Sequence, residues 1–484
     1  MAASFRSWMN VSSAFSCILN EKLCRRHLEI VETLTTVLRD TEYREAVQEE
    51  IFSSLLTVLS RLCEELQGAS RDDQDQRGFT LQVTAECFRA LRNSCVQCTR
   101  NQCMLRNLGF IDVSFKLLIS LQNLTLESPD GIFEPLRCGI QFLGNLSVGN
   151  QRCKDDIWQL IFPKFLLQLL HVNDDKTVSY ASMVLHTCLD EAKVEKLADS
   201  HHIQLALRVM ELCRVQPDLE WTIIIATHHF LKSPVLVKSM YAGMSDFDRV
   251  TLLELLLAQL KAEESKDSCI PPDVAHFVAC CFQKCCGDVL MLTTRSASSD
   301  EVMEEARIVT VLLEVLCEMT SDRTEFMFLQ DHPDLLLTTI ELLQQVHAMG
   351  KASSNIFSAT WNFSSLSIDG DFSPDCPVVN FKARLIRLIG NLCHSNTNNQ
   401  NKVRELDGIP LILDNCNIDS NNPFISQWAI FAIRNLLEHN KQNQELVGSL
   451  ERSGTVDYSA LRDLGFEIEE RDGSFLLKPV RKDG

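Results

Sequence analysis

The chain has 484 residues and a formal net charge of −19, because 65 Asp and Glu outnumber 46 Lys and Arg. A surface so acidic excludes a broad phosphate-binding face, since affinity for nucleic acids depends on clustered Lys and Arg. It favours partners that are basic or mixed in charge. The length exceeds the size at which a single core stops growing, and only 18 Gly and 13 Pro interrupt Leu-rich periodic segments. The composition therefore predicts one continuous stack of helices.

The 20 cysteines are scattered at mostly apolar positions rather than gathered in a compact disulfide framework. Met1 to Trp8 lacks the apolar core of a signal peptide, and no apolar run approaches the length of about 18 residues that a membrane span needs. We therefore expect reduced thiols in a cytoplasmic protein that does not insert into membranes.

Residues 1–78 are predicted to form an N-terminal helical cap and a loop. Apolar periodicity indicates two amphipathic helices, Lys22–Arg39 and Glu42–Leu66. The polar run Gly68–Gly78 that follows them is typical of a loop.

Residues 79–199 open with the first copy of a repeated unit. The apolar helix Cys87–Ser94 contains Asn93, and an Asn101-Gln102 pair begins eight residues after that Asn. Gly109 then marks a turn before the next apolar segment.

The next copies of the unit are less regular. Asn145 lies 52 residues beyond Asn93, the pair Asn150-Gln151 follows it more closely, and a loop at Ser128–Gly131 accounts for the extra length. In the third copy Thr187 stands 42 residues beyond Asn145, where an Asn is expected.

The middle of the chain loses the signature although its helical periodicity continues. Residues 200–347 are predicted to be degenerate helical repeats, with Glu318 in the Asn position. Residues 348–380 are rich in Ser, Asn, Gly, Asp and Pro and are predicted to be a flexible insertion within one unit. In the tail, 451–484, alternation around Asp472-Gly473 predicts a small hairpin.

Residues 381–450 contain the clearest repeats. Asn391 is followed eight residues later by Asn399-Gln400, and Asn435 is followed in the same way by Asn443-Gln444. The 44 residues from Asn391 to Asn435 are a period of armadillo and HEAT repeats, in which each unit completes its core against its neighbours. We therefore predict an all-α, armadillo/HEAT-like right-handed helical solenoid.

Signals at helix ends divide this unit into short, middle and long helices. Gly408 is predicted to take the left-handed conformation that ends the short helix and to be the structural turn, as Gly109 is in the N-terminal copy. Pro423 suits the first turn of the long helix, where Asn421 or Asn422 can cap the free amides.

These residues resemble the ataxin-10 family of armadillo-like proteins. The strongest similarity lies in Arg384–Cys393, Glu405–Cys416 and Asn422–Leu436, with N-terminal support from Glu86–Asn93 and Arg137–Asn145. The resemblance implies a non-enzymatic protein that supports neuronal survival, neurite outgrowth through G-protein and Ras–MAP kinase signalling, and cytokinesis. It also implies self-association and binding to a G-protein β subunit, an O-GlcNAc transferase and a nephrocystin-type ciliary protein. The implied locations are the cytoplasm, the perinuclear region, the centrosome or cilium basal body, and the midbody.

The Asn series has two interpretations. In peptide-binding armadillo proteins an Asn at this point of the long helix lines a concave groove and binds the backbone of an extended peptide. The matching positions here are Asn93, Asn145, Asn391 and Asn435. The peptide groove of armadillo transport receptors also needs a Trp four residues before each Asn, where this chain has Arg89, Gln141, Arg387 and Phe431. In the alternative, each Asn hydrogen-bonds the backbone of the neighbouring repeat, because a buried amide requires partners.

No other pattern indicates chemistry. Cys280-Cys281 and Cys285-Cys286 lack the second distant pair of a zinc site and are predicted to be buried apolar residues. The adjacent pairs His201-His202 and His228-His229 point about 100° apart on a helix and are poor ligand pairs. The chain has no P-loop, Gly-rich dinucleotide turn or nucleophile elbow. We expect no metal, cofactor or catalysis, and the two functional hypotheses are an interaction scaffold and an exchange-factor-like effector of a heterotrimeric G protein.

Overall fold

The computed structural model of the protein divides into two compact units, Met1–Gly243 and Met244–Gly484. The boundary falls inside the stretch 200–347 for which degenerate repeats are predicted. The structure describes residues 25–68, 74–125, 131–262, 270–293, 300–321, 324–352, 355–357, 376–416, 421–450, 466–471 and 474–479.

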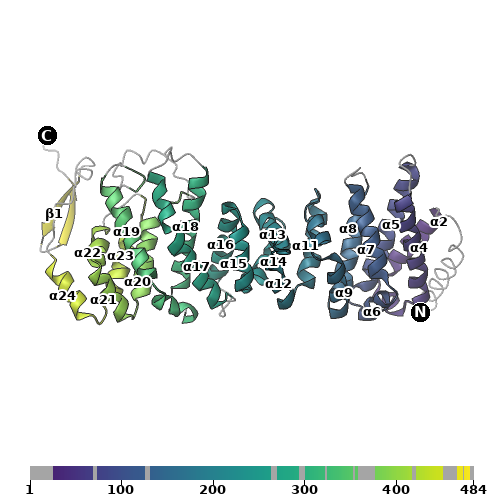
Figure 1. Ribbon diagram of the computed structural model, residues 1–484, viewed down its shortest axis with the longest axis horizontal. Coiled ribbons are helices and arrows are strands. Elements are labelled where there is room, and N and C mark those ends of the chain that lie inside the picture. Colours follow the sequence, from purple (N-terminus) through teal and green to yellow (C-terminus); the bar gives the residue numbers. More distant parts are fainter. Residues whose placement is uncertain are drawn as a thin grey trace. The chain divides into compact units, whose positions relative to one another are not determined.

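Unit 1 is a succession of short, middle and long helices (Figure 1). Its long helices α2, α5, α8, α11 and α14 pack against one another in that order. Its elements are α2 (Arg25–Val37), α3 (Thr41–Ala46), α4 (Glu49–Gly68), α5 (Gln74–Cys95), α6 (Thr99–Asn107), α7 (Phe110–Thr125), α8 (Phe133–Ser147), α9 (Gln151–Ile161), α10 (Lys164–Leu169), α11 (Asp175–Cys188), α12 (Glu191–Leu197), α13 (Ile203–Val215), α14 (Glu220–His228), η1 (Phe230–Lys232) and α15 (Pro234–Gly243).

Unit 2 repeats the plan with the long helices α16, α18, α20 and α23 packed in series. Its elements are α16 (Asp246–Lys261), α17 (Pro272–Cys285), η2 (Cys286–Thr293), α18 (Asp300–Met319), η3 (Thr324–Asp331), α19 (Leu335–Ala352), α20 (Phe381–Cys393), α21 (Thr397–Glu405), α22 (Gly408–Asp414), α23 (Ile425–Leu437), α24 (Lys441–Ser449), β1 (Phe466–Arg471) and β2 (Ser474–Pro479). The predicted fold class is therefore confirmed. The predicted C-terminal hairpin is also present, because β1 and β2 pair antiparallel with Arg471 opposite Ser474.

The core lies between successive long helices. Phe88 of α5 stacks on Phe142 of α8 with ring centroids 6.2 Å apart, and the two rings are fully buried. Most of the described cysteines are buried and all of them are free thiols. Burial raises the pKa of Cys188 and Cys213 to about 11, so these thiols stay protonated and act as small apolar residues.

The N-terminal cap differs from the sequence prediction. The stretch Glu42–Leu66 forms two helices, α3 and α4, because Val47 is extended with φ −62° and ψ 137°. Arg100 of α6 stabilises the break by donating from Nη1 to the Val47 carbonyl at 2.9 Å. Asn101 donates to the carbonyl of Arg44 at 2.8 Å. The partners that end α3 therefore come from the following repeat, which local periodicity cannot reveal.

The predicted loop and insertion are shorter than expected where the structure describes them. Gln74–Gly78, predicted as loop, is the first turn of α5, and Ala348–Ala352, predicted as insertion, is the last turn of α19. Residues 69–73 and 358–375 lie outside the described residues.

One helical run passes a length and hydropathy test for a membrane span, although no apolar segment of that length was expected. The run Pro272–Thr293 has a window with mean hydropathy 1.3. It changes from α17 to η2 at Cys286, and it buries Val274, Val278 and Phe282. A core helix passes the same test.

Candidate protein-binding surface

The four Asn residues of the repeat signature occupy equivalent places on their long helices, and each side-chain amide points back to the preceding long helix. Asn93 donates to the Thr35 carbonyl at 3.1 Å, and Asn145 donates to the Arg92 carbonyl at 3.1 Å.

The same bond recurs in unit 2. Asn435 donates to the Gly390 carbonyl at 3.0 Å. Asn391 donates to the Cys317 carbonyl at 3.1 Å and to Thr320 Oγ1 at 3.0 Å. These bonds are the ones that the inter-repeat interpretation requires. The peptide-groove role of the four Asn residues stays a prediction.

A second series of amides joins the short helices. Asn399 donates to the carbonyls of Gln330 in the preceding short helix, at 2.9 Å, and of Leu392 at the end of its own long helix, at 2.8 Å. Gln400 donates forward to the Asn435 carbonyl on the next long helix at 2.9 Å. In unit 1, Asn101 and Gln102 make the corresponding bonds to Arg44, Ser94 and Asn145. The Asn-Gln pair of α21 therefore joins its own helix to three others, the preceding short helix η3, its own long helix α20 and the next long helix α23.

The pair Asn150-Gln151 does not belong to this series. Asn150 is the N-cap of α9 and accepts from the Cys153 amide at 3.2 Å, as Asn396 and Asn440 do in their own short helices. Cys153 therefore occupies the place of Asn101, and its thiol approaches the Gln102 carbonyl at 3.9 Å. In the sequence, the short spacing between Asn145 and Asn150-Gln151 indicates that this pair does not correspond to Asn101-Gln102.

Other residues replace the amides where the signature fades. Gln330 of η3 was not singled out from the sequence, because it lies 12 rather than nine residues after the Asn position. It donates to the carbonyls of Asn391 and His394 at 3.2 and 3.0 Å, as Gln102 does to Asn145 and Val148. Between α11 and α14, His229 Nε2 lies 3.1 Å from His186 Nδ1, so an imidazole pair replaces the amide-to-carbonyl bond.

The two predicted turn glycines behave differently. Gly109 has φ +86°, a conformation that favours glycine. At the second turn Asp407 takes the left-handed conformation, with φ 54°, while Gly408 is the first residue of α22. The predicted left-handed Gly408 is therefore wrong. Glycine is required there because a Cβ would lie 2.6 Å from Val403 Cγ1.

The capping prediction for the last long helix is also wrong. α23 begins at Ile425, after an N-cap residue, Phe424, whose side chain makes no capping bond. The Asn422 side chain instead accepts from the Ala383 amide at 3.1 Å, and the Asn421 carbonyl accepts from the Asn380 amide at 2.8 Å. Asn422 therefore caps the neighbouring helix α20 rather than its own.

One surface of unit 2 combines charge and aromatic side chains, and we call it the long-helix face. It is formed by Glu314 and Glu318 of α18, Arg384 and Arg387 of α20, and Trp428 and Phe431 of α23. Arg384 pairs with Glu314 at 2.7 Å, and Arg387 pairs with Glu318 at 2.9 Å. Arg387 also lies over the Trp428 ring, 4.7 Å from its centroid. Arg384 and Arg387 are half-buried, and the other residues of α20 are buried, so this stripe is the main contact of α20 with solvent.

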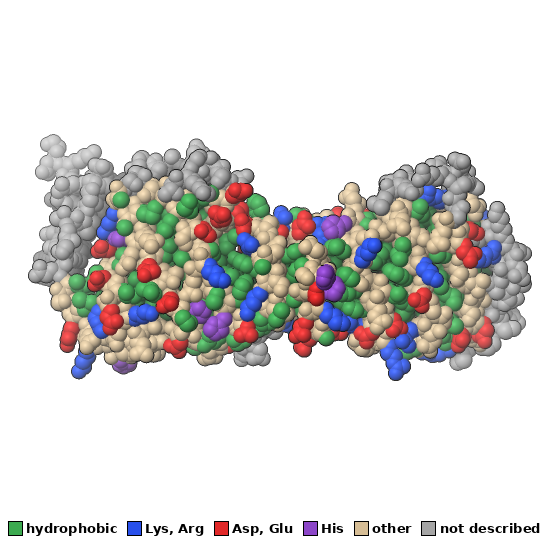
Figure 2. Space-filling model, viewed as in Figure 1, with side chains coloured by type: hydrophobic (Ala, Val, Ile, Leu, Met, Phe, Trp, Pro, Cys, Tyr) green, Lys and Arg blue, Asp and Glu red, His purple; other side chains and the backbone are tan. Residues whose placement is uncertain are grey.

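The charges of the long-helix face are matched within the protein. Burial opposes ionisation of Glu314, but Arg384 and Lys261 hold its pKa below the usual value. On the side of the molecule shown in Figure 2, Lys and Arg lie among Asp and Glu on each unit and do not gather into a broad basic patch. The face therefore suits a protein partner of mixed charge better than a polyanion.

The cysteine and histidine clusters do not form a metal centre in the described part of the chain. No group of three His, Cys, Asp or Glu there is arranged to hold a metal ion. Burial raises the pKa of Cys281 to about 11 and of Cys285 to about 12, which disfavours the thiolates that bind zinc. The predicted burial is wrong for Cys280, which is exposed and whose Sγ lies 3.8 Å from His332 Nε2.

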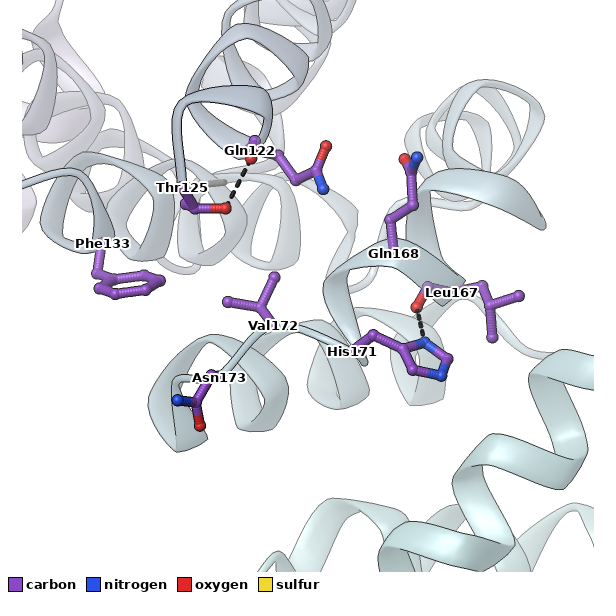
Figure 3. Close-up of a pocket in the computed structure, with 8 residues that line it drawn as sticks. All are labelled: Gln122, Thr125, Phe133, Leu167, Gln168, His171, Val172 and Asn173. Atoms are coloured by element: carbon purple, nitrogen blue, oxygen red, sulfur yellow. Dashed lines mark hydrogen bonds between the residues drawn. The ribbon is translucent and has the colours of Figure 1, made fainter. Parts of the chain in front are cut away.

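Unit 1 contains a pocket of about 650 Å³ that the sequence did not indicate (Figure 3). It lies between the C-terminal end of α7, the start of α8 and the end of α10. Its lining residues are Gln122, Thr125, Phe133, Leu167, Gln168, His171, Val172 and Asn173. The lining combines amide, hydroxyl and imidazole groups with the apolar side chains of Phe133, Leu167 and Val172, and none of these residues is Asp, Glu, Lys or Arg.

Repeats of short, middle and long helices, joined by side-chain amides to the backbone of their neighbours, define an armadillo-like helical repeat protein. A family model described as "Spinocerebellar ataxia type 10 protein domain" matches residues 381–478, and one described as "BEM4 N-terminal domain" matches residues 3–213. Ataxin-10 of Xenopus tropicalis is 43% identical over 460 residues, which cover 94% of this chain and 92% of that protein. Ataxin-10 of Homo sapiens is 40% identical, with 94% of each chain covered. The chain belongs to the ataxin-10 family.

Among solved structures, the SYS-1/POP-1 crystal complex is similar with a TM-score of 0.40 and 12% identity. The match covers 88% of this chain and 75% of that one.

Proposed function

We propose that the chain is a non-enzymatic scaffold that binds proteins through the long-helix face of unit 2. The observation that carries this proposal is the stacking of Arg387 on Trp428 where α20 and α23 meet solvent. Arg and Trp are the residue types most enriched among those that dominate binding energy at protein interfaces. The ion pairs beneath them fix the orientation of the Arg side chain, so a partner meets a preorganised surface.

Membership of the ataxin-10 family supports specific partners and roles. The proposed partners are a G-protein β subunit, an O-GlcNAc transferase and a nephrocystin-type ciliary protein. The proposed roles are neuronal survival, neurite outgrowth through G-protein and Ras–MAP kinase signalling, and cytokinesis. The proposed locations are the cytoplasm, the perinuclear region, the centrosome or cilium basal body, and the midbody. The net charge of −19 favours basic or mixed partner surfaces.

Self-association is proposed at the C-terminal end of the repeats. Ile430 of α23 and the nearby Phe424 are 69% and 54% exposed, whereas the preceding long helix α20 packs against α23. A second copy of the chain would bury these side chains. Light scattering should show a lower mass for Ile430→Glu, and an unchanged mass would contradict this interface.

The scaffold proposal is tested with purified partners. Full-length chain is immobilised, and the affinities of a G-protein βγ dimer and of an O-GlcNAc transferase are measured for the wild type, Trp428→Ala and a control, Val235→Ala. Val235 is also an exposed apolar residue, 60% exposed on α15 of unit 1. Loss of a dominant Trp costs about 2 kcal/mol or more, so Trp428→Ala should weaken binding about 30-fold. Equal affinities for all three proteins would contradict the assignment of this face.

The same proteins distinguish a scaffold from the alternative function, an exchange-factor-like effector of a heterotrimeric G protein. A scaffold leaves the rate of nucleotide release from the Gα partner unchanged, whereas an exchange-factor-like effector accelerates it. If the wild type accelerated nucleotide release and Trp428→Ala did not, the chain would be an exchange-factor-like effector rather than a scaffold.

A further inference from the structure

Gln122 is a buried side chain that faces the pocket of unit 1. It lies one turn before the end of α7 and is only 7% exposed. Its amide extends into the pocket, toward the amide of Gln168 on the opposite wall (Figure 3). The Gln122 amide has no hydrogen-bond partner among the described residues. The amide therefore faces the pocket rather than another group of the protein, and its position points to a ligand that bonds to it.

The pocket favours an uncharged ligand. None of its lining residues is Asp, Glu, Lys or Arg. The adjacent Arg137 and Asp174 are already paired, since Arg137 Nε donates to Asp174 Oδ2 at 2.7 Å. A charged group placed among these residues would lose hydration without gaining a counterion, which is costly.

The arrangement of polar and apolar groups matches a peptide. The side-chain amides of Gln122, Gln168 and Asn173 each offer donors and an acceptor, and a peptide backbone presents an N–H and a C=O at every residue. Phe133 and Val172 also line the pocket and supply an apolar surface beside these amides.

The openness of the site argues against a free small molecule. Gln168, His171 and Asn173 are exposed at the rim, whereas small-molecule sites bury roughly 70–90% of their ligand. A peptide segment that belongs to a larger partner needs to bury only one side chain here.

We propose that this pocket binds an extended segment of a partner protein, with one uncharged apolar side chain against Phe133 and Val172 and adjacent peptide groups bonded to the amides of Gln122 and Gln168. The site is a second protein-binding surface, separate from the long-helix face of unit 2. The inference rests on the proposed scaffold function, but the assay below measures the pocket alone.

The test uses capped pentapeptides, Ac-Ser-Ala-Xaa-Ala-Ser-NH2, in which Xaa is Leu, Phe, Lys or Glu. Their binding to the full-length chain is followed by saturation-transfer NMR. We expect the Leu and Phe peptides to bind with a Kd of about 1 mM or below, and the Lys and Glu peptides to bind at least about ten-fold more weakly.

The decisive variant is Gln122→Leu, which replaces a buried amide without a protein partner by an apolar group of similar size. It should weaken binding of the Leu and Phe peptides by about ten-fold. It should leave the melting temperature unchanged or raised, because no hydrogen bond within the protein is lost. The matched control is Gln159→Leu on the exposed side of α9, which should leave peptide binding unchanged.

Four results would overturn the proposal. These are equal signals from the four peptides, no binding of any peptide, and the same peptide affinity for Gln122→Leu as for the wild type. The fourth is a lower melting temperature of Gln122→Leu while its folded fraction still binds the Leu and Phe peptides. Binding of neutral fragments with no binding of peptides would also refute a peptide ligand. A failed G-protein or transferase experiment on Trp428→Ala alters none of these outcomes, so the two proposals fail separately.

Discussion

Removing the amides of Asn391 and Asn435 tests whether the repeat signature holds the repeats together. Asn435 is buried and makes one bond, to the Gly390 carbonyl at 3.0 Å, whereas Asn391 is buried and makes two. Losing one partner of a buried hydrogen bond costs about 1–3 kcal/mol, and Ala regains about 0.6 kcal/mol of helix propensity over Asn. We therefore expect Asn435→Ala to cost about 1 kcal/mol and Asn391→Ala about 2 kcal/mol.

Hydrogen exchange is the suitable assay, because a chain of two units has no single free energy of unfolding. Amides in α20 and α23 should exchange about five- to thirty-fold faster in the variants. The control is Asn398→Ala, an exposed helical Asn on α21, which should exchange at the wild-type rate or more slowly. The reasoning would be refuted if Asn391→Ala and Asn435→Ala exchanged no faster than the control Asn398→Ala, and if the double variant Asn391→Ala/Asn435→Ala nevertheless lost partner binding. That result would support the peptide groove.

Two further predictions concern a turn and a histidine pair. Gly408→Ala should destabilise α21 and α22 by about 1–3 kcal/mol, because its Cβ would meet Val403 Cγ1 at 2.6 Å. Asp407→Gly should not destabilise these helices. If urea titration showed the same loss of stability for both variants, the backbone conformation of the turn, and not the contact with Val403, would be the cause. Burial, and then the neighbouring His186, lower the pKa of His229 from its usual 6.5 to about 4. Between these two pH values the unfolded chain binds more protons than the folded chain. Unit 1 should therefore lose stability as the pH falls from about 6.5 to 4. His229→Gln should flatten that pH dependence in thermal melts, and an unchanged slope would exclude the pair as its cause.

The sequence predicted features that depend on local signals. The 44-residue spacing of Asn391 and Asn435 located α20 and α23, because apolar periodicity and the Asn position are local to each helix. The hairpin of β1 and β2 followed from alternation around a two-residue turn.

The features that the sequence missed depend on contacts between repeats. Arg100 of α6 stabilises the break after α3, Asn422 caps α20, and Val403 requires a glycine at 408. No local propensity contains these partners. The pocket is a similar case, since Gln122 has an unremarkable position in α7 until α8 and α10 are placed beside it.

The amide series has a direction that explains where the C-terminal stack can grow. Asn391 and Asn435 donate back to the preceding long helix, whereas Gln330 and Gln400 donate forward to the next one. Gln444 of α24 occupies the corresponding place, but it is exposed and donates only to the Leu437 carbonyl of its own repeat at 2.8 Å. Its own-repeat bond corresponds to that of Gln400 with the Cys393 carbonyl, and the forward bond of Gln400 to the next long helix has no counterpart for Gln444 among the described residues. The self-association proposed above would supply that missing acceptor from a second copy, because each repeat of a solenoid completes its contacts against a neighbour.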